Sequence, residues 1–172
     1  MPNVDAGKNL RDVRMAALFG IEDAELLDVV SARFLEPVFA LGRRYDDVLP
    51  VLNHLRAAGI RTGVVSNSPW GSPPSLWRAE LRRLELLDAV DISVFCGDVG
   101  WRKPAKAIFD HAAERIGVPP AECCFVGDDP RWDFEGATAA GMHPILLDRD
   151  GRYLAHAAHS ATTLSEVLDR LK

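Results

Sequence analysis

Long apolar runs are missing from this chain. The stretch 60–65 is already interrupted by Arg61 and Thr62, and such runs are far shorter than the roughly twenty apolar residues of a transmembrane helix. The N-terminal sequence MPNVDAGKNLRD also lacks the apolar centre of a signal peptide. We therefore expect a soluble, cytoplasmic protein without a membrane partner.

A surplus of positive charge and a cysteine framework are missing as well. The chain has 20 lysines and arginines against 25 aspartates and glutamates, a formal charge of −5, without a long run of either sign. Proteins that bind nucleic acid through its phosphates need clustered basic side chains, so nucleic acid is not an expected partner. The three cysteines include the adjacent pair Cys123 and Cys124, which suits neither an ordinary disulfide framework nor a zinc site, and we expect buried thiols.

The chain does contain enough apolar residues for one folded domain. Its 172 residues are 48% hydrophobic and 26% charged, which are values of a globular protein. From about residue 60, short β-branched runs alternate with segments of helical periodicity, the pattern of one parallel sheet with crossover helices. The predicted strands are 61–66, 91–95, 122–127 and 143–147, each apolar enough to be covered on both faces.

Helices are predicted between and after these strands, at 74–87, 104–116, 133–140 and 163–171. The segment 151–163 is predicted to be a surface connection. The first third is predicted to be helical, at 9–19, 23–34 and 46–58, with stops at Gly20, Pro37 and Gly59. Apolar residues of this appendage, such as Leu26 and Phe34, are expected to pack on one another; the alternative is that they face a partner subunit.

Polar side chains follow three of the predicted strands, at the edge where ligands bind in an open parallel sheet. They are Ser66 and Asn67 after the first strand, Lys103 after the second, and Asp128, Asp129 and Asp133 after the third. A hydroxyl, an ammonium and carboxylates together can bind a phosphate group and a hard cation, since Mg²⁺ prefers carboxylate oxygen and water. Structural roles are also open: Ser66 can end a strand, Lys103 can be solvated, and Asp128 can cap a helix.

Three sequence blocks resemble motifs II, III and IV of the haloacid dehalogenase-like (HAD) hydrolase superfamily. They are VVSNS, GWRKP and VGDDPRWDFEGATAAGM, and the similarity covers about 46–172. The resemblance implies a Rossmannoid, three-layer α/β fold with a parallel sheet and a small helical cap, short enough to suggest truncation. We accordingly predict an N-terminal segment with a partial helical cap at 1–44 and an α/β core at 45–172.

The resemblance also implies roles for the residues after the first two strands. Ser66 would donate a hydrogen bond to the transferring phosphoryl group. Lys103 would neutralise charge between this group and the nucleophilic carboxylate. Asn67 would orient the loop or the substrate.

For the residues after the third strand, the resemblance implies a metal site. Asp128 would ligate Mg²⁺. Asp129 and Asp133 would complete the site directly, or through water and hydrogen bonds. Gly127 would let the backbone approach the ion closely.

The first motif of the superfamily is not recognisable in this sequence. It is normally a hydrophobic strand ending in DxDxT, whose first aspartate is the nucleophile and whose second is the general acid and base. The nearest match is VDAGKNL, with Asp5 at the nucleophile position and Gly7 at that of the second aspartate. Only MPNV precedes Asp5, and Pro2 would remove a donor from a central strand. Three explanations stay open: a sequence that starts downstream of the first motif, a degenerate nucleophile at Asp5, or a non-catalytic relative.

The leading prediction is a HAD-like hydrolase of the phosphatase type, which uses Mg²⁺ to hydrolyse a small phosphorylated metabolite. The alternative is a nucleophile-deficient binding or interaction protein on the same fold. Carbon–halogen hydrolysis ranks third, because the acidic residues after the third strand are more typical of the phosphatases in the superfamily. A homodimer is a possible assembly.

Overall fold

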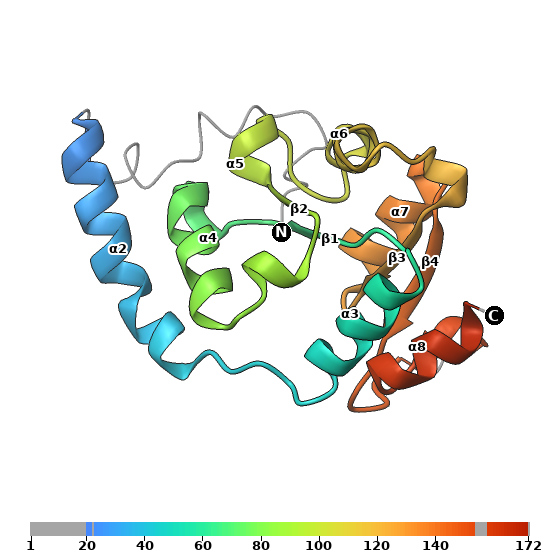
Figure 1. Ribbon diagram of the computed structural model, residues 1–172. Helices are drawn as coiled ribbons and strands as arrows, with labels where there is room; N and C mark the ends of the chain where they lie inside the picture. The colour runs from blue at the N-terminus through green and yellow to red at the C-terminus, as the bar shows by residue number, and fades with distance from the viewer. Residues whose placement is uncertain (1–19, 22, 154–157, 172) are drawn as a thin grey trace.

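Figure 1 shows the computed structural model, which describes residues 20–21, 23–153 and 158–171. Helices α2 (Ala24–Leu41) and α3 (Val48–Ala57) lead into strand β1 (Gly63–Ser66). The order continues with α4 (Pro74–Arg83), β2 (Ile92–Phe95), α5 (Cys96–Val99), α6 (Lys106–Ile116), β3 (Cys124–Gly127), α7 (Gly136–Ala140), β4 (His143–Leu147), β5 (Ser160–Ala161) and α8 (Leu164–Arg170). The chain is therefore an α/β protein, as predicted.

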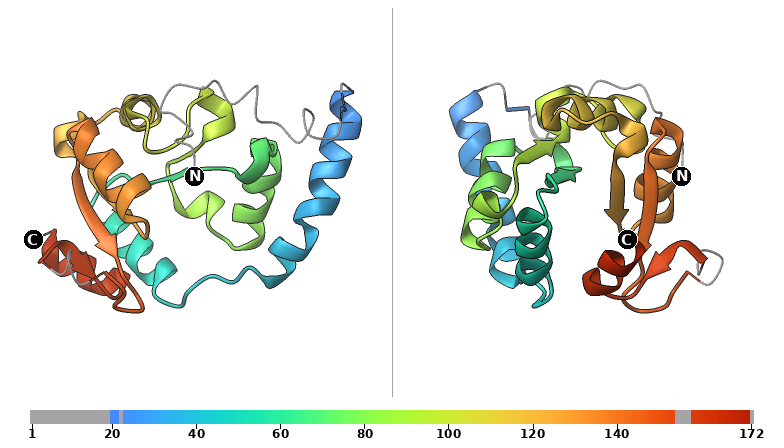
Figure 2. Two further views of the ribbon diagram at one scale, coloured as in Figure 1. Left: turned by 180° about the vertical axis from the view of Figure 1, so that it is seen from behind. Right: turned by 45° about the vertical axis from the view of Figure 1, so that its right-hand side comes forward.

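All strand pairs in the described residues are parallel, but they form two sheets. β1 pairs with β2, and β4 lies between β3 and β5. The right-hand view of Figure 2 shows the two groups of strands standing apart. The prediction of parallel strands is confirmed. Within the described residues no segment pairs with the second edge of β1 or of β3, so a single continuous sheet stays a prediction.

The strands differ in how deeply their side chains are buried. Val94 of β2 and Leu146 of β4 are 1% and 0% exposed. Val65 of β1 and Phe125 of β3 are only half-buried. The full burial expected of each strand is therefore wrong for β1 and β3, whose side chains at these positions are only half-buried in the part of the chain that the structure describes.

One apolar cluster joins the two sheets. It centres on α6, whose Ile108 and Phe109 are fully buried, and it includes Val94, Cys96, Ala112, Ala113, Ala137, Ala140 and Met142. Val65 from β1 and Phe125 from β3 pack against the same cluster. A Cβ at Gly136 would lie 2.9 Å from the Phe109 ring, so α7 can approach α6 this closely only with glycine at that position.

Helix α2 continues through Pro37 to its end at Leu41, so the predicted stop at Pro37 is wrong. Asp23 caps the first turn by accepting hydrogen bonds from the backbone N–H groups of Glu25 and Leu26, each 2.9 Å long. Proline removes one backbone donor from a helix and leaves the other hydrogen bonds available. The end of the helix is also held by side chains from outside it.

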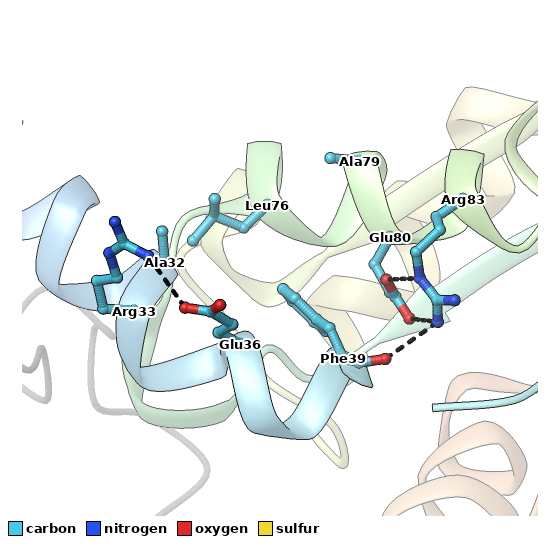
Figure 3. A pocket seen from close by; sticks show the side chains of 8 residues that line it. All are labelled: Ala32, Arg33, Glu36, Phe39, Leu76, Ala79, Glu80 and Arg83. Carbon is cyan, nitrogen blue, oxygen red and sulfur yellow. Dashed lines mark hydrogen bonds and ion pairs between the residues drawn. The ribbon is translucent and has the colours of Figure 1, made fainter. Parts of the chain in front are cut away.

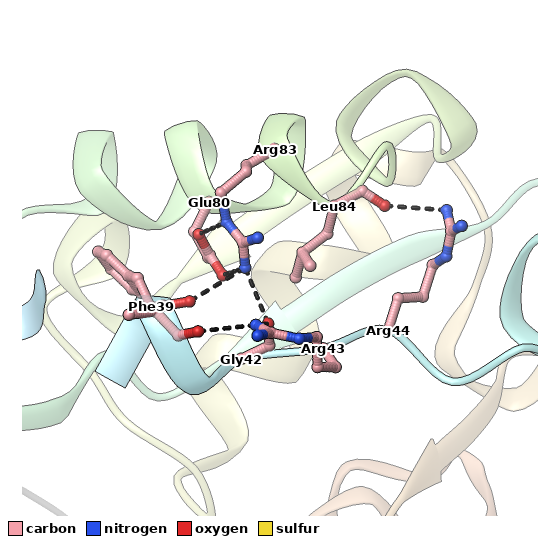
Figure 4. Close-up of polar contacts among 8 residues, drawn as sticks. Phe39, Gly42, Arg43, Arg44, Glu80, Arg83 and Leu84 are labelled. Carbon is pink, nitrogen blue, oxygen red and sulfur yellow. Dashed lines mark hydrogen bonds and ion pairs between the residues drawn. The ribbon is translucent and has the colours of Figure 1, made fainter. Parts of the chain in front are cut away.

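Arginines hold the carbonyl groups at the C-terminal end of α2 (Figure 4). Arg83 of α4 donates hydrogen bonds to the carbonyls of Phe39 and Gly42, 3.1 and 3.0 Å long. Arg43 donates to the carbonyls of Ala40 and Gly42, 2.7 and 2.8 Å long. These contacts satisfy carbonyl groups that a helix end leaves without an intrahelical partner, and they attach α2 to α4.

Helix α2 exposes much of its apolar surface. Leu35 is fully buried, but Leu26, Val29, Phe34 and Val38 are between 44% and 58% exposed. Leu26 and Phe34 are thus about half exposed, and their predicted packing within the appendage stays a prediction. Among the helices in the described ranges, none is long and apolar enough to span a bilayer.

Two further expectations need correction. Cys96 is buried as expected, but Cys123 is half-buried and Cys124 is exposed, since both lie at or beside the open strand β3; all three are free thiols. The segment 151–163 is not only a surface connection, because it contains β5, which pairs with β4. A strand of two residues is too short to show a periodic pattern in the sequence.

Candidate functional site

Three elements bring the predicted strand-end residues to one edge of the molecule. Ser66 is the last residue of β1, Lys103 lies between α5 and α6, and Asp128 directly follows β3. The carboxyl ends of parallel strands are the usual place for a ligand site in an α/β fold. Here a series of side-chain contacts connects the end of β1 with the end of β3.

The ammonium group of Lys103 is the centre of this series. Its Nζ donates a hydrogen bond of 3.1 Å to the carbonyl of Val65 on β1 and lies 2.5 Å from Oδ1 of Asp133, an ion pair. It also lies 5.4 Å from the centre of the Phe125 ring on β3. Only 12% of the Lys103 side chain is exposed, so the alternative of a solvated lysine is wrong.

Asn67 fixes the backbone of Lys103. Its Oδ1 accepts a hydrogen bond from the Lys103 N–H (2.8 Å), and its Nδ2 donates to the Lys103 carbonyl (3.2 Å). An amide that bonds both backbone groups of one residue holds that residue in a fixed orientation. Asn67 therefore orients the lysine loop, and its contact with a substrate stays a prediction.

Asp133 is buried and orients the acidic loop, which carries Asp128 and Asp129 directly after β3. Its Oδ2 accepts hydrogen bonds from the N–H groups of Asp128 and Asp129, each 3.1 Å long, while its Oδ1 faces Lys103. A Cβ at Gly127 would lie 2.5 Å from the Asp133 carboxylate. Glycine is thus needed at 127 for the close approach of β3 to Asp133.

Asp129, rather than Asp128, caps the next helical segment. Its Oδ1 accepts hydrogen bonds from the N–H groups of Arg131 and Trp132, 2.9 and 2.6 Å long, at the start of the π-helical segment Pro130–Glu135. Asp128 is exposed, and its carboxylate makes no hydrogen bond within the described residues. The Ser66 hydroxyl, which is half-buried, makes none there either.

These carboxylates do not by themselves complete a cation site. In the part of the chain that the structure describes, no group of three His, Cys, Asp or Glu side chains is placed to hold a metal ion. Asp129 and Asp133 use their oxygens for backbone N–H groups and for Lys103, so Asp128 is the one of the three predicted metal ligands with a free carboxylate there. Asp5, the predicted nucleophile, lies outside the described residues.

An aromatic and cationic rim lies beside the acidic loop. The guanidinium of Arg102 lies 4.8 Å from the centre of the Trp132 ring, and Trp132 is 40% exposed. This pair, and the contacts of Lys103 with Val65 and Phe125, could not be predicted from the sequence, because the partners come from different elements.

A groove of about 390 Å³ lies elsewhere, between α2 and α4 (Figure 3). Its charged side chains already have partners: Arg33 pairs with Glu36 at 3.2 Å, and Arg83 pairs with Glu80 at 2.6 Å. None of the strand-end residues lines it. We therefore place the candidate site at the strand ends.

Comparisons with known proteins gave consistent matches. A family model described as haloacid dehalogenase-like hydrolase matches residues 7–141. The chain is 33% identical over 131 residues to a glyceraldehyde 3-phosphate phosphatase from Methanopyrus kandleri, covering 76% of this chain and 54% of the relative. It is 32% identical over 127 residues to (S)-2-haloacid dehalogenase 1 from Pseudomonas sp. (strain CBS-3), covering 72% and 54%.

A solved structure shares both the fold and the sequence similarity. The HAD phosphatase from Thermococcus onnurineus is 30% identical and superposes with a TM-score of 0.73, covering 91% of this chain and 68% of that structure. The chain spans little more than half the length of the two curated relatives named above. These relatives include a phosphatase and a dehalogenase.

Proposed function

The chain belongs to the haloacid dehalogenase-like hydrolase family, and from this premise we propose that it hydrolyses a small phosphorylated metabolite in the cytoplasm. The reaction breaks the phosphorus–oxygen bond of a phosphomonoester with water and yields an alcohol and inorganic phosphate. Ser66, Lys103 and Asp128 are the residues proposed to act on the phosphoryl group, and a relative at 33% identity is named as a phosphatase.

The observation that carries this proposal is the nearly buried ammonium of Lys103 at the end of β1. It lies 3.1 Å from the Val65 carbonyl, and Val65 directly precedes Ser66, whose hydroxyl has no partner among the described residues. A phosphoryl oxygen at this edge would accept a hydrogen bond from Ser66 and lie in the field of Lys103. Burial strengthens this field, because the surrounding dielectric is lower than that of water.

Mg²⁺ is the proposed cofactor, with Asp128 as its direct ligand. When bound, the ion would supply charge neutralisation to the phosphoryl group. Asp129 and Asp133 are proposed to act on the ion indirectly, because their hydrogen bonds fix the loop that carries Asp128. The other ligands would be water and groups outside the described residues, among which Asp5 is the proposed nucleophile.

The test is phosphate release by the 172-residue chain from a panel of small phosphomonoesters, with and without Mg²⁺. We expect turnover that requires Mg²⁺ and falls by about 10²–10³-fold in Lys103→Ala and in Asp128→Asn, because each removes a charge directed at the reacting group. Folded protein that releases no phosphate from any ester with Mg²⁺ present would contradict the proposal.

Two further variants complete this experiment. Asp150→Asn is the matched control, since Asp150 is an exposed aspartate that pairs with Arg152 at 3.4 Å, and it should keep full turnover. Asp5→Asn tests the proposed nucleophile. Turnover that survives Asp5→Asn removes that assignment and leaves the phosphatase proposal in place.

A binding or interaction protein without a nucleophile is the second candidate. This candidate is favoured because the carboxylate of Asp129 binds a backbone N–H group and that of Asp133 pairs with Lys103. Among the three predicted ligands in the described residues, only Asp128 then has a carboxylate free to bind a cation. Such a protein would bind inorganic phosphate or Mg²⁺ in calorimetry without turnover. Halide release from a 2-haloacid, measured in the same samples, tests the third option, which the dehalogenase relative represents. A homodimer stays a prediction that sedimentation can check.

A further inference from the structure

The rim formed by Arg102 and Trp132 holds a positive charge at the surface beside the candidate site. The guanidinium of Arg102 lies 4.8 Å from the centre of the Trp132 ring, and Trp132 is 40% exposed. An aromatic face attracts a guanidinium and leaves the N–H donors at the edge of the group available. Within the described residues, the Arg102 guanidinium makes no hydrogen bond and no ion pair. The ring therefore positions a charged group whose donors have no partner in that part of the chain.

The other stacked arginines of the described ranges differ from Arg102 in one respect. Three of them lie over an aromatic ring, and each also pairs with a carboxylate. The pairs are Arg78 with Asp98, Arg149 with Asp47, and Arg152 with Asp150, at 2.6, 2.9 and 3.4 Å. Arg102 has the contact with the ring and, among the described residues, no contact with a carboxylate. A carboxylate from a ligand would give Arg102 the same two contacts.

The rim lies directly beside the proposed phosphoryl site. Arg102 precedes Lys103 in the sequence, and Trp132 precedes Asp133. Lys103 and Asp133 form the buried ion pair, and consecutive Cα atoms are only about 3.8 Å apart, so the same two segments carry both contacts. A molecule whose phosphoryl group lies at Lys103 would therefore have its other atoms close to Arg102.

The charges around the rim favour an anion only at Arg102. Asp133 pairs with Lys103, and Asp129 accepts a hydrogen bond from the N–H of Trp132, so neither carboxylate neutralises Arg102. The acidic loop repels a second negative charge on the same ligand. Contact with the guanidinium offsets this repulsion, because an arginine binds a carboxylate through two parallel hydrogen bonds.

We propose that Arg102, held on the ring of Trp132, binds a carboxylate on the alcohol part of the substrate. The substrate class is then the phosphate ester of a small hydroxy acid, rather than that of a neutral alcohol or sugar. This inference rests on the proposed function for the phosphoryl end of the substrate and adds the residue that selects the other end. The planar fork of the guanidinium matches both oxygens of a carboxylate, which gives specificity as well as affinity.

The first test compares phosphate release from matched esters by the full chain. The esters are the phosphates of glycolate, 3-hydroxypropanoate and 4-hydroxybutanoate, each beside its uncharged primary amide. We expect the best acid to exceed its amide in kcat/KM by about 10–100-fold, because the amide loses a charged hydrogen-bonded pair with the guanidinium. In Arg102→Gln this preference should disappear, while kcat/KM for the amide stays within about threefold of the parent value.

Three variants show which property of the rim matters. Arg102→Lys keeps the charge without the planar fork, so part of the preference should stay. Trp132→Leu keeps Arg102 without the ring, and the preference should fall by about 2–5-fold. Arg115→Gln is the matched control, since Arg115 is exposed near the C-terminal end of α6 whereas Lys103 precedes the start of this helix; it should keep the full preference.

A binding measurement separates this inference from the proposed function. The ligands are the phosphonate analogues of the three acids and of their amides, which have CH₂ in place of the ester oxygen and are not hydrolysed. The indole N–H signal of Trp132, assigned with Trp132→Leu, is followed by NMR with Mg²⁺ present. We expect at least one acid to shift this signal and to bind about tenfold or more tightly than its amide, a difference that Arg102→Gln should abolish.

The outcomes of the two measurements are distinct. Phosphate release that does not distinguish acids from amides would overturn the carboxylate site and leave the proposed function in place. Tighter binding of an acid, lost in Arg102→Gln, without phosphate release from any ester would support the carboxylate site and contradict the proposed function. Equal binding of acids and amides, or no binding of either, would overturn the carboxylate site.

Discussion

Lys103 and Asp133 are both nearly buried, and each is the counter-charge of the other. The exposed fractions of their side chains are 12% and 6%. Removing one partner of a buried pair leaves a charge without compensation, which costs more than the pair itself contributes. The ion pair is therefore a stability contact as well as a part of the candidate site.

We expect Asp133→Asn to lower the free energy of unfolding by about 3 kcal/mol, because Lys103 is left buried without its counter-charge. Urea unfolding followed by circular dichroism measures this change. The double variant Lys103→Met/Asp133→Asn should recover part of the loss, since no charge stays buried. A single variant as stable as Asp150→Asn would contradict the expected role of the pair.

The thiol of Cys124 gives a second prediction at this scale. Burial of the sulfur, and to a lesser degree the neighbouring Cys123, raises its pKa from 9.0 to about 11, although part of the residue is exposed on β3. We expect iodoacetamide to alkylate Cys124 about 100-fold more slowly at pH 8 than a thiol of pKa 9.0, because the thiolate is the reactive form. Site-resolved mass spectrometry across pH 8 to 11 measures the rate, which should still rise with pH at the upper end. A rate that levels off near pH 9 would exclude the raised pKa.

At the scale of elements, Asp47 connects α3 with α8. Its carboxylate accepts hydrogen bonds from Arg149 and from the N–H of Leu164, each 2.9 Å long. The hydrogen bond from Arg149, followed by that from Leu164, holds the pKa of Asp47 below its ordinary value of 3.8, against the opposing effect of burial. The stabilisation by Asp47 is therefore present above pH 3.8 and is lost as the pH falls through the lower pKa of the folded state.

We expect Asp47→Asn to cost about 1 kcal/mol of unfolding free energy near pH 7, because it removes a charge-assisted hydrogen bond between two helices. The difference between the parent chain and the variant should shrink as the pH falls below 3.8. Urea unfolding at several pH values from 7 to 3 measures it. A difference that stays constant over this range would mean that the carboxylate charge does not contribute.

The elements also show which features a sequence can predict. The strand 143–147 has the predicted limits, because a short apolar run between two turns is a local signal. Helix α4 ends at Arg83 instead of 87, since the chain turns at Glu85, whose φ is +62°. Glutamate rarely adopts a positive φ, so the sequence does not indicate a turn at this position. Helix α2 passes Pro37 because Arg83 and Arg43 hold its end.

In the candidate site, too, local features could be predicted from the sequence and contacts between separate elements could not. The sequence could place Ser66, Lys103 and Asp128 near strand ends, because the position of a strand end is local and parallel strands share one edge. It could not predict that Asp133 pairs with Lys103, that Asp129 caps a helical segment, or that Asn67 holds the lysine loop. Those contacts depend on how separate elements pack.

At the scale of the whole molecule, helix α6 carries the connection between the two sheets. Phe109 is fully buried and contacts the Phe125 ring edge-to-face, with ring centres 5.0 Å apart. One cluster therefore supports both the β1–β2 side and the β3–β4–β5 side.

We expect Phe109→Ala to lower the free energy of unfolding by about 3–5 kcal/mol, because it opens a cavity in that cluster. The amides of β2 and β4, followed by NMR in increasing urea, should lose their signals in a single shared transition. Leu41→Ala is the control, since Leu41 is 80% exposed and its replacement should be nearly neutral. Separate transitions for the two sheets would show that α6 does not couple them.

The arginines at the end of α2 have a consequence for proteolysis. A protease that cuts after arginine must draw that side chain into its own specificity pocket, but Arg43 is bonded to the carbonyls of Ala40 and Gly42, and Arg44 to that of Leu84. Trypsin can therefore cleave the connection between α2 and α3 only after these bonds open. The rate of that cut measures how often α2 separates from α4 in solution.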